Sequence, residues 1–145
     1  MNYKFFLSFL SFIIVLMACN SSPYRQGEAL YVTNCANCHM EDGSGLGRNI
    51  PVLAQSDYLV THRNQLACIV KYGLKDTILV NGTTYHQAMP GNAKLSDVEI
   101  TNILNYVFQA WENNLPVIHL KEVTMSLETC NDNFVKYFAD FIEKR

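Results

Sequence analysis

The alternation of apolar and polar residues predicts a mainly helical chain. Ahead of the C-terminal extension, helices are expected at residues 24–34, within residues 57–72 and at residues 96–113. The third begins with Ser96 and Glu99, whose spacing is that of a capping box at a helix N-terminus. Pro116 prevents its continuation, and Gly73 is placed to end the second helix.

One short hairpin is predicted between the second and third helices. Residues 78–80 and 83–85 have β-type character and flank Asn81 and Gly82. An Asn-Gly pair in this position is the strongest short-range hairpin signal. The hairpin is a small excursion near residues 78–85 and not a sheet, so the expected fold class is all-α.

The loop at residues 40–55 carries three glycines at alternate positions, Gly43, Gly45 and Gly47. Glycine has no Cβ, so this run suits a chain that passes close to a flat ligand. A flexible loop without a ligand would carry glycines equally well. Both interpretations stay open at this stage.

The first apolar run has the character of an export signal. Lys4 precedes residues 5–17, which are all apolar apart from two serines. The run is too short for a comfortable membrane span of about 20 residues. It ends at Ala18 and Cys19 in a pattern that resembles a lipobox, where a signal peptidase cuts before a cysteine that receives a lipid.

We therefore expect residues 1–18 to be a signal peptide of lipoprotein type, Cys19 to carry the lipid, and residues 19–23 to form a short tether. The alternatives are an uncleaved anchor and an ordinary secretory signal. All three export the rest of the chain. The expected location is a bacterial membrane, with the protein facing the periplasm or the cell surface.

The full chain of 145 residues has the size of one domain with an appendage. We expect that domain at residues 24–115 and a C-terminal helical extension at residues 116–145. Asp132 can cap a last helix. The apolar stripe of that helix comprises Phe134, Phe138, Phe141 and Ile142.

Composition and charge narrow the class of partner. The chain is 49% hydrophobic and 17% charged, with a net charge of −2, which is typical of a globular protein. Removal of residues 1–18 takes away Lys4 and leaves 10 basic against 13 acidic side chains, a net charge of −3. Because phosphate binding needs a basic face, nucleic acid is not an expected partner.

Residues 35–39 carry the most informative motif. Cys35, Cys38 and His39 form a C-x-x-C-H pattern, which is the attachment site of a c-type haem. Each cysteine would form a thioether with one vinyl group, and His39 would ligate the iron. A zinc ribbon needs a second ligand pair, and the sequence has no other C-x-x-C. A thioredoxin-like pair usually follows a strand, whereas a helix is predicted here.

Two further cysteines, Cys68 and Cys130, belong to no motif. In an oxidising compartment they could form a disulfide that links the extension to the domain. They could equally be two independent thiols, one in a helix and one in the tail. The sequence favours neither arrangement.

The second axial ligand of the iron is expected to be Met89. It lies 50 residues after His39 in a polar loop, which Pro90 makes rigid. Met40 adjoins His39 and cannot reach the opposite face, and Met125 lies in the tail. His86 and an open position remain as alternatives. Thioether sulfur stabilises Fe(II), so a His/Met site suits an electron carrier.

From these motifs the chain resembles a class I cytochrome c over residues 24–112. The resemblance rests on the C-x-x-C-H motif, on Gly43 and Gly45, on residues 51–53 and 87–90, and on the capped third helix. It implies an all-α fold in which N- and C-terminal helices cross over a haem pocket.

The same resemblance implies two contacts. Gly27 and Tyr31 would meet Ile103 and Tyr106 at the helix crossing, and the Pro51 carbonyl would accept a hydrogen bond from His39 Nδ1. The extension at residues 116–145, like the cysteine pair Cys68 and Cys130, is not part of the family pattern.

The expected function is that of a monohaem cytochrome c, a one-electron carrier between redox proteins on the exported face of a bacterial membrane. No small-molecule substrate and no catalysis are expected. The alternative is a fixed electron-transfer subunit of a dehydrogenase or oxidase complex. A haem sensor would need an open sixth position, and a peroxidase would need a distal acid–base pair.

Overall fold

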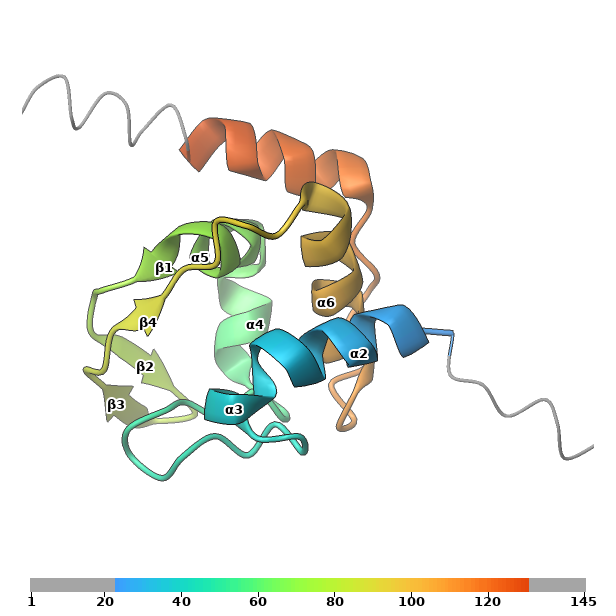
Figure 1. Cartoon of the computed structure of the whole chain (residues 1–145). Coiled ribbons are helices and arrows are strands. Elements are labelled where there is room, and N and C mark those ends of the chain that lie inside the picture. The colour runs from blue at the N-terminus through green and yellow to red at the C-terminus, as the bar shows by residue number, and fades with distance from the viewer. Residues whose placement is uncertain (1–22, 131–145) are drawn as a thin grey trace, which may run out of the picture.

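The computed structural model describes residues 23–130. The predictions for the signal peptide, Cys19, the tether up to residue 22, and the helix capped by Asp132 lie outside the described residues. The labelled elements are α2 (Arg25–Asn34), α3 (Ala36–His39), α4 (Asp57–Thr61), η1 (Arg63–Gln65), α5 (Leu66–Tyr72), β1 (Gly73–Leu74), β2 (Ile78–Val80), β3 (Thr83–Tyr85), β4 (Met89–Pro90) and α6 (Asp97–Gln109). Residues 120–130 form a further helix (Figure 1).

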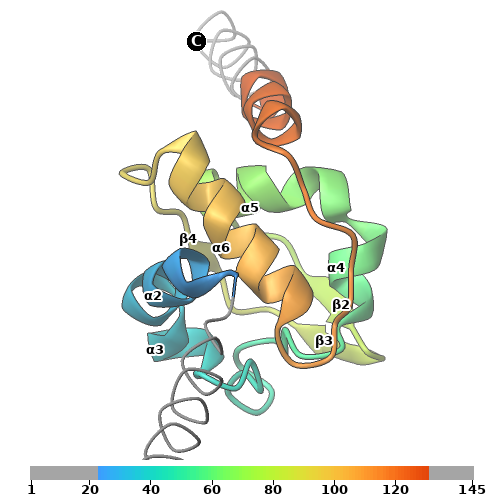
Figure 2. The ribbon, with the colours of Figure 1, turned by 90° about the vertical axis from the view of Figure 1, so that its right-hand side faces the viewer.

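The fold is all-α, and α2 packs across α6 (Figure 2). Close approach depends on Gly27, where a Cβ would collide with the backbone carbonyl of Asn102 and lie 2.9 Å from the Tyr106 Cβ. Tyr31 is fully buried, and its ring centroid lies 5.4 Å from that of Tyr106. The expected contact of Gly27 and Tyr31 with Tyr106 is therefore present, and Ile103 is buried in the same core.

The third helix begins as predicted and ends earlier. Ser96 caps α6, and the capping box with Glu99 is complete. The helix stops at Gln109, not at Asn113, and Trp111 has a positive φ of 52°. The Asn113 side chain donates to the Val107 carbonyl at 2.7 Å. A terminal helix carbonyl thus finds a partner without another helical turn.

Residues 57–72 are helical and end at Gly73, as predicted, but they do not form one continuous helix. The structure breaks them into α4, η1 and α5, with His62 between the first two. Residues 61–65 are all polar, so the apolar face that would hold a continuous helix is interrupted there. Arg63 instead donates to the carbonyls of Pro116 and Val117, at 2.8 and 2.9 Å.

The predicted hairpin is present, and a second strand pair accompanies it. β2 pairs with β3 through a turn in which Asn81 and Gly82 have φ of 47° and 75°, as a type I′ turn requires. The sequence did not predict the second pair, in which β1 runs antiparallel to β4 with Leu74 opposite Met89.

The C-terminal extension begins its helix at Leu120, before the predicted cap at Asp132. Glu122 accepts a hydrogen bond from the His119 amide at 2.9 Å, which caps the helix start. Ile118, Val123 and Leu127 are buried in the same core as α6. The described part of the extension thus packs on the domain. None of the helices within residues 23–130 is long and apolar enough to cross a bilayer.

Candidate functional site

The C-x-x-C-H motif lies where α2 passes into α3. Cys35 separates the two helices, its amide donates to the Tyr31 carbonyl at 2.8 Å, and its carbonyl accepts from the His39 amide at 2.9 Å. One helical turn therefore separates Cys35 from Cys38, so both side chains lie on one side of the backbone. Among residues 23–130, these two are the free cysteines.

The two thiols differ in their surroundings. Cys38 is exposed and Cys35 is partly buried. Burial, and secondarily the nearby Cys38, raise the pKa of the Cys35 thiol to about 11. Both sulfurs are thus available for a covalent bond, and Cys35 remains a neutral thiol at neutral pH until that bond is made.

His39 is buried, with 7% of its surface exposed, and its orientation is fixed. Its Nδ1 lies 3.1 Å from the Pro51 carbonyl oxygen. A carbonyl only accepts hydrogen bonds, so Nδ1 carries the proton and Nε2 carries the lone pair. Burial lowers the pKa of His39 more than this hydrogen bond raises it. The side chain is thus a neutral imidazole with Nε2 available to a metal.

Two glycines shape the loop that supplies the Pro51 carbonyl. A Cβ on Gly45 would collide with the Ile50 carbonyl and lie 2.7 Å from the Pro51 carbonyl oxygen, and a Cβ on Gly43 would lie 2.6 Å from the Trp111 ring. Both residues have a φ of +69°. The contacts in the structure are therefore with the protein itself: Gly45 lets the Pro51 carbonyl approach His39, and Gly43 makes room for Trp111.

Three aromatic rings lie behind the motif. The centroids of Tyr31, Tyr106 and Trp111 are 5.2 to 5.6 Å apart. The Tyr31 hydroxyl donates to the Met40 carbonyl at 2.7 Å, and Trp111 Nε1 donates to the Glu41 carbonyl at 3.2 Å. Burial raises the pKa of Tyr31, so this phenol stays protonated as a donor.

The sequence did not predict that these rings fix the two residues after His39. Trp111 does lie within the helix predicted at residues 96–113. The hydrogen bonds to Met40 and Glu41, however, depend on the chain turning back at Ala110, which no local pattern indicated.

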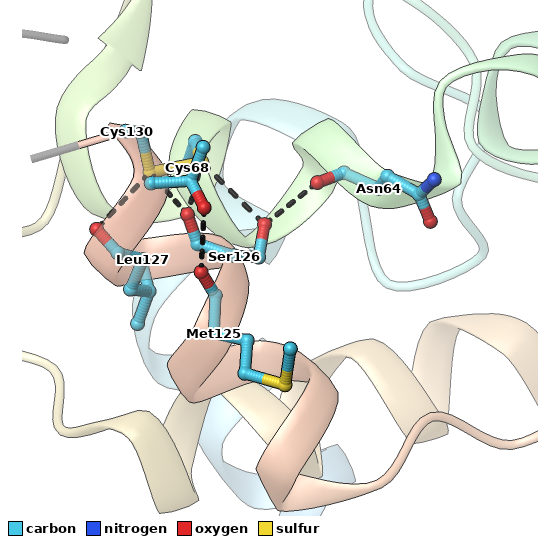
Figure 3. Close-up of a disulfide and its surroundings, with 7 residues drawn as sticks. Asn64, Cys68, Met125, Ser126, Leu127 and Cys130 are labelled. Carbon is cyan, nitrogen blue, oxygen red and sulfur yellow. Dashed lines mark hydrogen bonds between the residues drawn. A yellow bond between two sulfur atoms is a disulfide. The ribbon is translucent and has the colours of Figure 1, made fainter. Parts of the chain in front are cut away.

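Met89 lies in β4, opposite Leu74 of β1, and is half-buried. Figure 1 shows β4 on the same side of the α2–α6 crossing as α3. The alternative ligand His86 is exposed, and its Nδ1 lies 3.0 Å from Thr77 Oγ1. Met125 is 56% exposed on the C-terminal helix, beside Ser126 and near Cys130 (Figure 3).

The donor set fits a c-type haem. Two free thiols one helical turn apart match two thioether bonds, and the neutral imidazole of His39 offers Nε2. Two cysteines with a histidine directly after the second are the attachment pattern of a covalently bound haem. Together the fold and the site define a class I c-type cytochrome.

Comparison with known proteins gives the family. Residues 24–111 match the cytochrome c family model, and the chain belongs to this family. It binds haem c covalently and transfers electrons. It is 33% identical over 102 residues to cytochrome c-552 of Thermus thermophilus, across 68% of this chain and 77% of that protein.

A second group of relatives consists of larger proteins. The chain is 38% identical over 94 residues to the cytochrome c subunit of a quinone alcohol dehydrogenase from Gluconobacter oxydans. The corresponding subunit from Komagataeibacter europaeus is 31% identical over 105 residues. The matches cover 62% and 70% of this chain but only 19% and 22% of those subunits.

Proposed function

We propose that this chain is a one-electron carrier with a single haem, attached through Cys35 and Cys38 and ligated axially by His39 and Met89. It passes electrons between redox proteins and does not act on a small-molecule substrate. When bound, the haem supplies an iron that alternates between Fe(II) and Fe(III). The observation that carries the proposal is the His39 Nδ1–Pro51 hydrogen bond, because it leaves Nε2 as a fixed ligand.

The residues around the iron each have a task in this proposal. The Pro51 carbonyl orients the imidazole of His39 and increases its basicity. Met89 favours the reduced ion because its sulfur is soft, so His/Met ligation gives a higher potential than two histidines would. A site closed on both faces also excludes small ligands. Little has to move when an electron arrives, which favours fast transfer.

The test of the ligand assignment is the visible spectrum of the purified holoprotein. We expect a low-spin haem c in the wild type and a high-spin or substituted site in Met89→Ala. Met125→Ala is the matched control, because Met125 is exposed on the C-terminal helix, and it should keep the wild-type spectrum. An unchanged spectrum in Met89→Ala would remove Met89 from the site.

We also propose that the protein is exported and held at a bacterial membrane by a lipid on Cys19. The basic start, the short apolar run and the lipobox-like end of residues 1–19 support this. Metabolic labelling with a radioactive fatty acid should mark the wild type and not Cys19→Ala. Label on both proteins, or on neither, would contradict lipidation at this position.

A second candidate is a fixed subunit of a larger dehydrogenase complex. The similarity to cytochrome c subunits of quinone alcohol dehydrogenases favours it. Gel filtration of mild detergent extracts discriminates the two. A carrier elutes at the size of this chain with its detergent micelle, whereas a fixed subunit elutes with a dehydrogenase activity that follows the haem absorbance.

A further inference from the structure

We propose that the Cys68–Cys130 disulfide is a positioning device for Met89, acting through α5. The structure contains this disulfide, with the two Cα atoms 6.2 Å apart and a sequence separation of 62. The sequence left open whether these cysteines are linked or independent thiols, and in the structure they are linked. The proposal builds on Met89 as an axial ligand, and its test separates the two ideas.

The loop that carries Met89 is attached to the end of α5. β4 pairs with β1, which follows α5 directly. The Asn92 amide donates to the Val70 carbonyl at 2.9 Å, and Lys71 Nζ donates to the Leu95 carbonyl at 2.5 Å. The last turn of α5 and the residues directly after it therefore fix the position of Met89.

Gly73 and Gly91 allow the backbones of β1 and of the Met89 loop to lie in close contact. A Cβ on Gly73 would lie 2.5 Å from the Met89 carbonyl oxygen, and a Cβ on Gly91 would lie 2.6 Å from the Gly73 amide nitrogen. The two backbones are in direct contact at Met89 and at the two residues that follow it. A shift of α5 must move this loop as well, because no side chain between them can absorb the movement.

The first turn of α5 is attached to the C-terminal helix. Cys68 lies in that turn and bonds to Cys130 (Figure 3). Ser126 of the same helix donates from Oγ to the Asn64 carbonyl in η1 at 2.6 Å. Thus the described part of the extension holds the start of α5, while the end of α5 holds Met89.

The two helices do not pack flush along their length. A groove of about 740 Å³ lies between them, and its lining includes Ile69 and Tyr72 of α5 and Met125 and Thr129 of the C-terminal helix. Met125 and Tyr72 are 56% and 44% exposed. Because side-chain packing is incomplete along this groove, the disulfide is what fixes the distance between the start of α5 and the C-terminal helix here.

α5 is too short to hold its own shape. It has seven residues, and isolated helices of that length are not stable in water. Leu66 and Ala67 at its start are buried in the core, whereas Ile69 and Val70 near its end are only partly buried against it. The rigidity of its end therefore depends on contacts at its start, and loss of the disulfide should loosen the loop of Met89.

The test uses the haem-loaded protein with Cys68→Ala and Cys130→Ala combined. Two readouts are compared: the rate at which added imidazole binds the ferric iron, and hydrogen exchange of the Asn92 amide. Both should increase about tenfold, which is a usual size for coupling between sites. Thr129→Val is the matched control, since within residues 23–130 the Thr129 hydroxyl donates only to the Met125 carbonyl of its own helix, and it should change neither.

A general loss of stability must be told apart from this local effect. The Ala110 amide, which donates to the Tyr106 carbonyl at the end of α6, serves as reference. The proposal predicts that the double variant accelerates exchange at Asn92 more, relative to the wild type, than it accelerates exchange at Ala110. Equal acceleration at both amides, or no acceleration at Asn92, would overturn it.

Ser126→Ala keeps the proposal testable if the double variant does not fold. It removes the hydrogen bond to Asn64 and leaves the disulfide in place, so a smaller change in the same direction is expected, and no change at Asn92 would count against the proposal. If the wild-type ferric spectrum lacks the charge-transfer absorption of a methionine–iron bond, Met89 is not the ligand. Exchange at Asn92 still reports whether the disulfide controls the loop.

Discussion

At the scale of the residue, the orientation of His39 depends on a glycine six positions later. Gly45 packs against the Pro51 carbonyl that His39 donates to, and its amide donates to the His39 carbonyl at 3.1 Å. A side chain at residue 45 would push that carbonyl away. The imidazole would then lose the acceptor that fixes its proton on Nδ1.

Gly45→Ala tests this arrangement. Its left-handed backbone and its contact with Pro51 should together lower the free energy of unfolding by about 2–5 kcal/mol. The reduction potential should rise, because an imidazole without its acceptor donates less charge to Fe(III). Urea unfolding and a redox titration measure the two effects.

Gly47→Ala is the matched control for this substitution. Gly47 also has a positive φ, of 54°, but a Cβ there meets nothing within 4 Å. It should lose only about 1–2 kcal/mol, from backbone strain, and keep the wild-type potential. Equal potentials in all three proteins would contradict the role of Gly45.

Also at the scale of the residue, the N-terminal cap of α6 makes the stability of the fold depend on pH. Glu99 accepts hydrogen bonds from the Ser96 amide and hydroxyl, at 2.8 and 2.7 Å, and these lower the pKa of its carboxyl. A carboxyl with a lowered folded-state pKa stabilises the fold above its unfolded pKa of about 4.3, and this stability is lost as the pH falls below that value.

Glu99→Gln should therefore be less stable than the wild type at pH 7. The difference should shrink as the pH falls below about 4. Urea unfolding at several pH values measures it, with Glu128→Gln on the C-terminal helix as control. A difference that does not vary with pH would show that the cap does not depend on the charge of Glu99.

At the scale of the element, Arg63 joins the extension to the domain. Its guanidinium donates to the carbonyls of Pro116 and Val117 and lies 4.7 Å from the centroid of the Phe108 ring. Two charge-assisted hydrogen bonds and a cation–π contact thus meet in one side chain. They hold the chain between α6 and the C-terminal helix.

Arg63→Met should lower the free energy of unfolding by about 2 kcal/mol. Arg63→Lys should recover only part of this loss, because an ammonium cannot reproduce the two-pronged geometry. Thermal unfolding of both variants beside the wild type measures the effect. Full recovery with lysine would show that the charge alone matters.

The elements that the sequence predicted well are those with local signals. The capping box of Ser96 and the Asn81-Gly82 turn lie within four residues each, and both formed as expected. The pairing of β1 with β4 was missed because it joins two short segments 15 residues apart, neither of which has a strand pattern of its own. The break at His62 lies in a polar run that the sequence does show, but the carbonyls that hold Arg63 there are more than 50 residues away.

At the scale of the whole molecule, the motif and the family could be read from the sequence, and the family match covers the same region. The contact between His39 and Pro51 followed from the resemblance and is present in the structure. The disulfide could not be decided, because the distance between Cys68 and Cys130 depends on how the extension packs. That packing brings Ile118, Val123 and Leu127 into the core and makes the extension part of the domain.

An electron carrier and a haem sensor differ in whether protein ligands occupy both axial positions of the iron. The most direct measurement is addition of carbon monoxide to the reduced, haem-loaded protein at neutral pH. With His39 and Met89 both bound, the visible spectrum should not change. A spectrum that shifts at once to that of a carbon monoxide adduct would mean an open sixth position and would contradict the electron-carrier site proposed here.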